Sequence, residues 1–243
     1  MDLIRQRLEN TTILFLGGTS GIGLAAAKMA AYYGARPILV GRNADKLSEA
    51  AAQFSNARTA LLDVTDESTL EVFFQSLGKV DHIFATHSGP YYARLHKIDF
   101  EKVRQNFHDR FVSMLAIARF GKEHINHGGS ITFMGGTTSR KPGPSYSITG
   151  PLNDAVETLT KGLAIELAPV RVNIIPAGFV NTQLSKSILK DRYEARIMEL
   201  EQTLPIGRIV EPEDVAMLAI QLMANGAVTG GVFDIDGGQN IVQ

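Results

Sequence analysis

Residues 16–29 read LGGTSGIGLAAAKM, a glycine-rich turn that runs directly into a strongly helical sequence. The turn follows the apolar run Thr12–Leu16, which we predict to be a strand, and the helix is predicted over Ile22–Tyr33. Glycines here permit a tight turn, and the amide groups at the start of the helix attract a pyrophosphate. An ordinary tight turn that needs positive φ is the alternative. The order strand, glycine loop, helix favours a dinucleotide-binding βαβ unit.

The alternation of short apolar runs and amphipathic stretches continues along the chain. Further strands are predicted at Pro37–Val40, Thr59–Leu62, His82–Ala85, Ser130–Met134 and Val170–Ile175. Further helices are predicted at Ala44–Gln53, Glu67–Leu77, inside Phe100–His124 and at Gly150–Ala168. Strict alternation indicates an α/β fold with a doubly wound parallel sheet of about seven strands, covered by helices on both faces and linked by right-handed crossovers.

No low-complexity tract or long linker interrupts this pattern, so we predict a single domain over residues 1–243. The one irregular stretch is Gly178–Arg208, which contains a helix-like segment at Asp191–Gln202. It follows the C-terminal end of a predicted strand, where ligands bind in such sheets. We therefore interpret residues 178–208 as a substrate lid, and a surface excursion used only in packing is the alternative.

The composition excludes several classes of protein. The chain of 243 residues carries 24 Lys and Arg against 25 Asp and Glu, with no Cys and no basic run longer than Arg140-Lys141. This balance gives no electrostatic footprint for nucleic acid or an anionic membrane, and no disulfide framework. Asp2 and Glu9 spoil a signal peptide, and no His, Asp and Glu cluster has metal-ligand spacing. We expect a cytoplasmic protein with a small-molecule substrate and no metal.

The glycine loop resembles that of the short-chain dehydrogenase/reductase family, which reads TGxxxGxG, with Leu16 in place of the Thr. The resemblance extends over nearly the whole chain and includes Arg171-Val172-Asn173 and Asp236-Gly237-Gly238. It implies a Rossmann-type fold, a nicotinamide cofactor and a homodimer or homotetramer. The cofactor is expected to be held by Gly17, Thr19, Ser20, Gly21, Ile22, Gly23, Arg42, Asn43, Asp63, Val64, Thr86, His87, Ser88, Asn153, Gly178, Val180 and Thr182.

The end of the second predicted strand bears on which nicotinamide cofactor is bound. An acidic side chain there would accept hydrogen bonds from a ribose 2′-hydroxyl, but the sequence reads Val40-Gly41-Arg42-Asn43. The guanidinium of Arg42 can pair bidentately with a 2′-phosphate, as in family members that use NADP. We therefore predict NADP(H), and an Arg42 that merely lies on the surface is the alternative.

The catalytic set of the family is altered in this chain. Members that resemble it reduce carbonyls with a Ser, a Tyr and a Lys four residues later, supported by an Asn. A register without gaps puts Gly136, Thr149 and Asn153 at the Ser, Tyr and Lys, and Phe107 at the Asn. A second register, similar to the related enoyl-acyl-carrier-protein reductases, puts Tyr146 seven residues before Asn153. The resemblance implies an atypical member that lacks the Asn-Ser-Tyr-Lys tetrad.

Loss of the lysine affects the two reaction directions differently. An ammonium about 4 Å from a phenol contributes roughly 4 kcal/mol at an effective dielectric of 20, so without it the phenol stays protonated and oxidation of an alcohol is crippled. Reduction needs only a proton donor, for which Tyr146, Thr137, Ser88, His87 or a water is available. Tyr146, Thr137 and Asn153 are the candidate catalytic residues, and the Asn153 amide can hold the nicotinamide ribose.

These observations predict an NADP(H)-dependent reductase of a small carbonyl, quinone or enone. Conjugated acceptors suit the altered site because they stabilise oxyanion charge themselves. The alternative is a catalytically silent NADP(H)-binding sensor or partner subunit. Cofactor binding is common to both, so the sequence separates them poorly.

Overall fold

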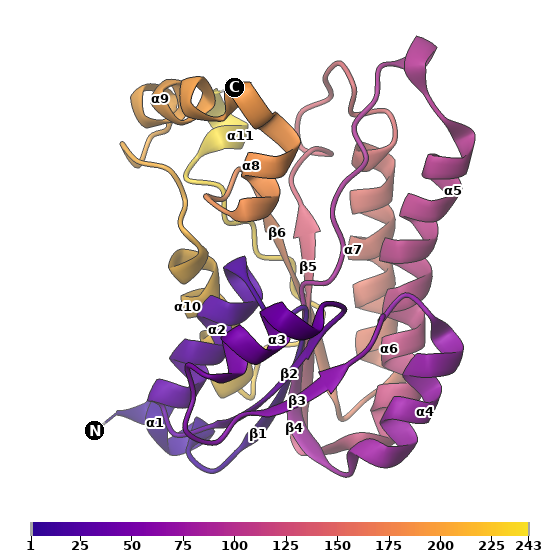
Figure 1. Cartoon of the computed structure of the whole chain (residues 1–243), viewed down its shortest axis with the longest axis vertical. Coiled ribbons are helices and arrows are strands. Elements are labelled where there is room, and N and C mark those ends of the chain that lie inside the picture. The colour runs from indigo at the N-terminus through magenta and orange to yellow at the C-terminus, as the bar shows by residue number, and fades with distance from the viewer. Residues whose placement is uncertain (1, 243) are drawn as a thin grey trace.

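A six-stranded parallel sheet forms the centre of the computed structural model, which describes residues 2–242 (Figure 1). The strands lie in the order β3-β2-β1-β4-β5-β6, so the chain reverses its direction across the sheet between β1 and β4. Ligands of such sheets bind at this switch point, beyond the C-terminal ends of the strands. The strands are β1 (Thr12–Leu16), β2 (Arg36–Gly41), β3 (Arg58–Leu61), β4 (Val80–Ala85), β5 (Ile125–Gly136) and β6 (Arg171–Ala177).

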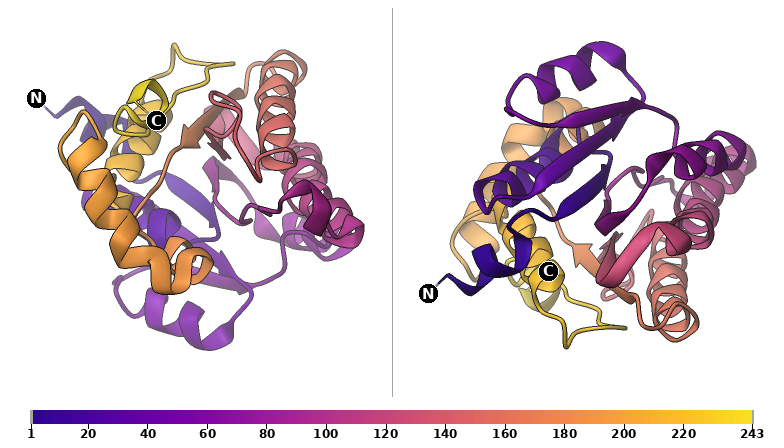
Figure 2. Two further views of the ribbon diagram at one scale, coloured as in Figure 1. Left: turned by 90° about the horizontal axis from the view of Figure 1, so that it is seen from above. Right: turned by 90° about the horizontal axis from the view of Figure 1, so that it is seen from below.

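Helices cover both faces of the sheet (Figure 2). One face carries α1 (Leu3–Leu8), α2 (Gly21–Tyr32), α3 (Ala44–Ala51) and α10 (Pro212–Ala224). The opposite face carries α4 (Glu67–Leu77), α5 (Phe100–Phe107), α6 (Ser113–Gly121) and α7 (Thr149–Glu166). The remaining helices are α8 (Gln183–Leu189), α9 (Tyr193–Thr203) and α11 (Gln239–Val242), with short turns η1 (Leu95–Lys97), η3 (Lys122–His124) and η4 (Lys190–Arg192).

The apolar strands have side chains in two separate cores. Leu14 and Leu16 of β1 belong to the core beneath α4, α6 and α7, whereas Ile13 and Phe15 belong to the core beneath α2 and α10. Because both faces are covered, successive residues of a central strand are buried alike, and the strand reads as an unbroken apolar run. The predicted doubly wound α/β fold is confirmed.

The count of about seven strands is one more than the structure forms. Residues 230–235 run beside β6, where the Ile174 amide donates to the Gly231 carbonyl at 3.0 Å and the Phe233 amide donates to the Ile174 carbonyl at 3.1 Å. This segment makes only isolated bridges to β6, at Val232 and Ile235. The Gly230 amide still donates to the Val172 carbonyl at 2.7 Å, and the Ile235 amide donates to the Pro176 carbonyl at 2.9 Å. Pro176 of β6 lies between the two bridges and has no N–H to donate, so the ladder is interrupted there.

The long helix predicted inside Phe100–His124 is present but contains an irregular turn. Between α5 and α6 lies η2 (His108–Val112), one turn of π-helix. The Ser113 hydroxyl donates to the backbone carbonyl of Asp109 at 2.6 Å within the same helix. Turns of this kind are rare in soluble proteins and often lie at functional sites.

The segment 178–208 lies at the end of the molecule toward which β5 points (Figure 1). It contains α8 and α9, and Val180 bridges to Val210 just after the segment. The Tyr193 hydroxyl donates to the Asn181 side chain, which ties α9 back to the start of the segment. No helix among residues 2–242 combines the length and the apolar character needed to cross a bilayer.

Candidate active site

The glycine loop after β1 packs against the end of β4. A Cβ on Gly23 would lie 2.3 Å from the Gly17 carbonyl oxygen and 2.8 Å from Thr86 Oγ1. Gly17 has a φ of +92°, and its carbonyl accepts a hydrogen bond from the Thr86 hydroxyl at 3.2 Å. Gly23 therefore lets α2 pack closely on the loop, and Thr86 fixes the loop to the neighbouring strand.

The start of α2 is open toward a ligand. Gly21 has a φ of +50°, and a Cβ there would project toward Thr182, with the Thr182 Cγ2 atom 3.4 Å away. Ser20 caps α2 without a side-chain hydrogen bond, and the first turn of the helix contains no acidic residue. Ile22 is partly buried and packs against the core beneath α10. Free amides at a helix N-terminus fit a pyrophosphate, so the loop fits a dinucleotide.

The end of β2 carries Arg42, the side chain predicted to pair with a 2′-phosphate of the cofactor. Arg42 lies 3.5 Å from the Asp63 carboxylate, and its side chain is 66% exposed. A Cβ on Gly41 would lie 2.5 Å from the Thr19 Cγ2 atom, so Thr19 packs against the strand end. Asn43 uses its side-chain oxygen to cap α3, accepting from the Lys46 amide at 2.9 Å.

Asp63 is held in its charged form. Burial works against its charge, but hydrogen bonds from the Thr65 amide and hydroxyl, together with Arg42, hold the pKa of Asp63 below its ordinary value. Val64, which follows it, is buried in the sheet core. Arg42 therefore has a carboxylate partner, although most of its side chain remains accessible to a ligand.

The end of β4 continues into Thr86-His87-Ser88. The His87 Nε2 atom lies 2.7 Å from the Ser113 hydroxyl, whose own proton goes to the Asp109 carbonyl. Nε2 therefore carries the ring proton, and His87 Nδ1 is left as a buried acceptor with no partner in the part of the chain that the structure describes. Burial lowers the pKa of His87 to about 4, against the opposing effect of the Asp109 backbone. At neutral pH the ring is uncharged, which argues against His87 as an imidazolium acid.

Asn153 of α7 is buried and held on both sides. Its amide nitrogen donates to the Thr138 hydroxyl at 2.8 Å, and its amide oxygen accepts from Arg110 Nη2 at 3.0 Å. A Cβ on Gly136, at the end of β5, would lie 3.0 Å from the Asn153 amide nitrogen. Thr149, one turn before Asn153, is buried with a hydroxyl that has no partner within residues 2–242. Gly136 and Asn153, which the gap-free register aligned with the family's Ser and Lys, therefore lie close together.

Arg110 is a buried residue of the candidate site that the sequence patterns did not single out. It lies in η2, is only 8% exposed, and lines a small cavity of about 20 Å³ together with Thr86, His87 and Ser88. A signal was present, because helical spacing from Arg110 leads to the buried Met114, Ile117 and Gly121. An arginine on the buried stripe of a helix needs a structural or functional partner.

Tyr146 lies in the loop between β5 and α7, where it is half-buried. Its ring centroid is 5.8 Å from that of Tyr92, a second tyrosine that the sequence analysis did not single out. Burial raises the pKa of Tyr92, and Tyr146 adds to this while Arg110 opposes it. Thr137 is buried at the end of β5, and its carbonyl accepts from the Arg140 amide at 3.0 Å.

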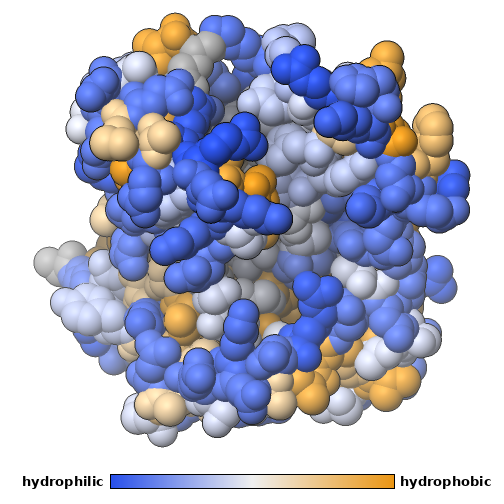
Figure 3. Space-filling model, turned by 45° about the horizontal axis from the view of Figure 1, so that its top comes forward, coloured by the Kyte–Doolittle hydropathy of each residue, from blue (hydrophilic) through white to orange (hydrophobic). Residues whose placement is uncertain are grey.

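The segment after β6 closes the site from the other side. A Cβ on Gly178 would lie 2.7 Å from the Asp236 Cβ atom, so Gly178 lets the C-terminal segment approach. Val180 is buried, and Thr182 caps α8 by accepting from the Ser185 amide at 3.1 Å. The face that carries these strand ends is hollowed near its middle and has a mostly hydrophilic rim (Figure 3). Across residues 2–242, no group of three or more His, Asp or Glu side chains is arranged to hold a metal ion.

The chain matches known proteins over nearly its full length. Residues 17–240 match the family model described as Enoyl-(Acyl carrier protein) reductase. The chain is 28% identical to short-chain dehydrogenase/reductase malC of Malbranchea aurantiaca over 96% of each protein. It is also 28% identical to carbonyl reductase family member 4 of Xenopus laevis, over 91% of this chain and 94% of that protein.

Solved structures of similar proteins superimpose on this chain over nearly its full length. The structure of MalC Reductase/Diels-Alderase from Malbranchea aurantiaca superimposes with a TM-score of 0.87 at 27% identity, over 97% of this chain and 98% of that one. A small-chain dehydrogenase in complex with NADPH superimposes with a TM-score of 0.80 at 30% identity, over 96% of this chain and all of that one. The resemblance read from the glycine loop thus extends through the fold.

Proposed function

The chain belongs to the short-chain dehydrogenase/reductase family of oxidoreductases, and from that premise we propose that it is an atypical NADP(H)-dependent reductase of a small carbonyl, quinone or enone. One geometric observation carries the proposal. Thr86 and His87 contact the glycine loop at Gly17 and also line the cavity that contains Arg110. The phosphate cradle and a buried cation therefore meet at one end of the sheet, although Asn153 stands where the family has its lysine.

The cofactor proposal rests on three groups of the chain. The amides at the start of α2 would hold the pyrophosphate, Asp63 and Val64 the adenine, and Arg42 a 2′-phosphate. A relative solved in complex with NADPH supports this choice, and no acid at the end of β2 opposes it. When bound, NADPH supplies a hydride at the nicotinamide.

Replacement of Arg42 tests the choice between NADPH and NADH. A charge-assisted hydrogen bond contributes about 1.5–3 kcal/mol, so Arg42→Ala is expected to weaken NADPH binding roughly tenfold to a hundredfold. NADH binding should stay unchanged, as should both affinities in the control Arg58→Ala on the neighbouring strand β3. Fluorescence titration of both cofactors measures the effect. Unchanged NADPH affinity in Arg42→Ala would refute the assignment.

The residues around the reacting centre have distinct proposed tasks. Asn153 accepts from Arg110 and donates to Thr138, so one amide N–H remains free for an oxygen of the nicotinamide ribose. Tyr146 is the proposed proton donor, with Thr137 as the second candidate. Neutral His87 contributes an acceptor at Nδ1 and no acid.

Turnover is tested with a panel of acceptors. We expect NADPH to be consumed when quinones, enones and diketones are supplied, because such acceptors depend least on a strong acid. Simple aldehydes should react slowly or not at all. NADPH binding without turnover on any acceptor would instead identify a cofactor sensor or partner subunit. Efficient reduction of simple aldehydes alongside no reaction with quinones or enones would contradict the proposed substrate class.

Two further expectations belong to this proposal. Residues 178–208 act as the substrate lid, which is supported by the contact of Leu184 with Gly89 beyond β4.

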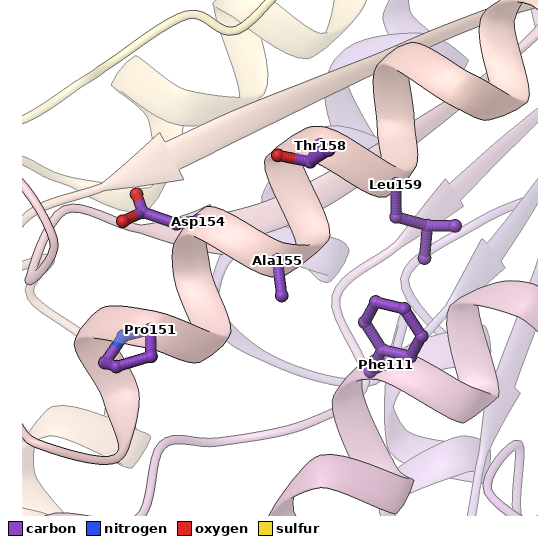
Figure 4. A pocket seen from close by; sticks show the side chains of 6 residues that line it. All are labelled: Phe111, Pro151, Asp154, Ala155, Thr158 and Leu159. Atoms are coloured by element: carbon purple, nitrogen blue, oxygen red, sulfur yellow. The ribbon is translucent and has the colours of Figure 1, made fainter.

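A homodimer or homotetramer is supported by an open concavity of about 540 Å³ on the outer side of α7 (Figure 4). Ile165 on the same helix is 80% exposed, which also supports an interface there. Light scattering measures the mass in solution. The concavity is lined by Phe111, Pro151, Asp154, Ala155, Thr158 and Leu159.

A further inference from the structure

Among the described residues, Arg110 and Arg171 are buried arginines, and Arg140 is a partly buried arginine with carboxylate partners. Arg171 is 6% exposed and donates to the carbonyls of Leu222, Met223 and Val228, so it caps the end of α10. Arg140 pairs with Glu157 and Asp234 at 2.7 Å each, and those hydrogen bonds hold its pKa above the ordinary value. Arg140 thus has two carboxylate counter-charges, and Arg171 has three carbonyl acceptors near a helix C-terminus, where a cation is favourable.

Arg110 differs from both. Its one hydrogen bond within residues 2–242 is the 3.0 Å contact to the neutral Asn153 amide oxygen, although a guanidinium has five N–H donors. No carboxylate of the described chain lies within 4.0 Å of it. Burial lowers the pKa of Arg110, and the only opposing influence is Tyr92. Burying a cation without a counter-charge lowers the stability of the folded protein. A functional role for Arg110 would explain why the protein retains it.

The cavity beside Arg110 indicates what its functional role is. It lines a cavity of about 20 Å³ between the ends of β4 and β5, with Thr86, His87, Ser88 and Met134 in the same wall. A space of this size admits about one oxygen atom or water molecule. The same wall includes His87, which touches the glycine loop through its backbone. The uncompensated charge thus lies next to the end of the sheet where the cofactor loop is found.

We propose that Arg110 binds the acceptor oxygen of the substrate, and that the substrate is a conjugated ketone, quinones included, whose oxygen carries the negative charge after hydride addition. This inference rests on the proposed reductase function. The substrate gains a hydride from the cofactor at carbon, and its conjugated π electrons shift so that one electron pair comes to rest on the oxygen. A proton from solvent or Tyr146 then completes the reduction. A guanidinium stabilises such an oxyanion without having to give up a proton.

Kinetics of three variants test this assignment. Arg110→Met removes the charge but keeps a side chain of similar length, and it is expected to lower kcat/KM for an enone or quinone about a hundredfold. Arg110→Lys keeps the charge without the planar fork and should retain an intermediate activity. Arg119→Gln is the control, because Arg119 is exposed on the same long helix. NADPH affinity should be unchanged in Arg119→Gln, and both Arg110 variants should still bind NADPH, because the glycine loop and Arg42 are untouched.

A binding experiment gives a readout that does not depend on turnover. Benzoate and its neutral isostere benzamide are titrated into the NADP⁺ complex by calorimetry. The wild type and Arg119→Gln should bind benzoate at least tenfold more tightly than benzamide, and Arg110→Met should lose that preference. Arg110→Met should also melt at the same temperature as the wild type or higher, because an apolar replacement of an uncompensated buried charge removes a cost.

The outcomes separate this inference from the proposed function. Wild-type protein that binds no NADPH, or turns over no acceptor, overturns the reductase proposal on which the inference rests. Wild-type turnover that survives in Arg110→Met, or a benzoate preference that persists there, overturns the assignment of Arg110 alone. A large drop in the melting temperature of Arg110→Met with no change in benzoate preference identifies a purely structural arginine.

Discussion

The proposed cofactor cradle and the proposed reacting end of this molecule are built in opposite ways. The cradle consists of the seven residues Gly17–Gly23, which run from the end of β1 into the first turn of α2, and it presents mainly backbone amides and glycines. The reacting end brings together His87, Arg110, Thr138 and Asn153 from four separate segments, and it works through side chains. Backbone recognition of a phosphate tolerates almost no change, whereas side-chain chemistry can be redistributed among the elements that meet at one place.

Introducing a lysine at position 153 tests whether the reacting end is organised around Arg110. Asn153→Lys would put an ammonium close to the guanidinium that now lies 3.0 Å from the Asn153 oxygen. Two like charges about 4 Å apart repel by roughly 4 kcal/mol at an effective dielectric of 20, and the free energy of unfolding should fall by about that amount. Urea denaturation measures the change.

The double variant is the control for this prediction. Asn153→Lys combined with Arg110→Met should recover most of the lost stability, because the repulsion requires both charges. If Asn153→Lys alone is stable and reduces simple aldehydes efficiently, the reacting end is not organised around Arg110.

A pH titration compares the two ends of β4, because His82 lies near its start and His87 just after its end. Burial lowers the pKa of each to about 4. The unfolded chain binds the proton near pH 6.5, so the stabilising contribution is complete above pH 6.5 and is lost as the pH falls toward 4. Over that window each histidine accounts for about 3 kcal/mol.

Urea denaturation between pH 7.5 and pH 4.5 measures this loss. His82→Gln and His87→Gln should each remove about half of the pH dependence in that range. A free energy of unfolding that stays constant across it would show that neither ring is kept neutral by burial.

The smallest change in NADPH affinity is expected from a single substitution in the proposed cradle. It measures how much the left-handed backbone conformation of Gly21 contributes to cofactor binding. Gly21→Ala forces a Cβ onto a residue with a φ of +50°, where it would face Thr182 at 3.4 Å. Such a conformation costs a non-glycine residue about 1–2 kcal/mol, and the free protein relieves this strain by moving the loop out of the binding geometry. NADPH should therefore bind up to roughly tenfold more weakly, because binding has to restore that geometry. Gly226→Ala is the control, since a Cβ there meets nothing within 4 Å. Equal NADPH affinity in both variants would contradict the proposed cradle.

Sequence patterns predicted most of the fold because parallel strands between helices are apolar over their whole length. The strand at Thr12–Leu16 and the helix at Glu67–Leu77 begin and end where they were expected. The seventh strand was the exception, because residues 230–235 run beside β6 without a continuous ladder. The π turn at His108–Val112 was also missed, because helical periodicity cannot resolve one added residue within a turn.

Some residues of the candidate site could likewise be predicted from the sequence, and others could not. Gly17, Gly21 and Gly23 could be found from their spacing, because a tight turn between a strand and a helix imposes local rules on the backbone. Arg110 and Tyr92 could not be assigned, because their roles depend on neighbours far away in the chain. Asn153 lies 43 residues from Arg110, and only the packing of α7 beside η2 joins them.

The amino-acid sequence by itself determined the parallel α/β sheet, the glycine loop between β1 and α2, and the absence of a lysine at position 153. These follow from local periodicity and from the restricted conformations of a few glycines. Only the tertiary structure decided that a guanidinium from the π turn meets Asn153, that His87 Nδ1 is buried without a partner among residues 2–242, and that Tyr146 contacts Tyr92. Burial and electrostatic compensation depend on which segments pack together, and no local pattern in the sequence encodes that.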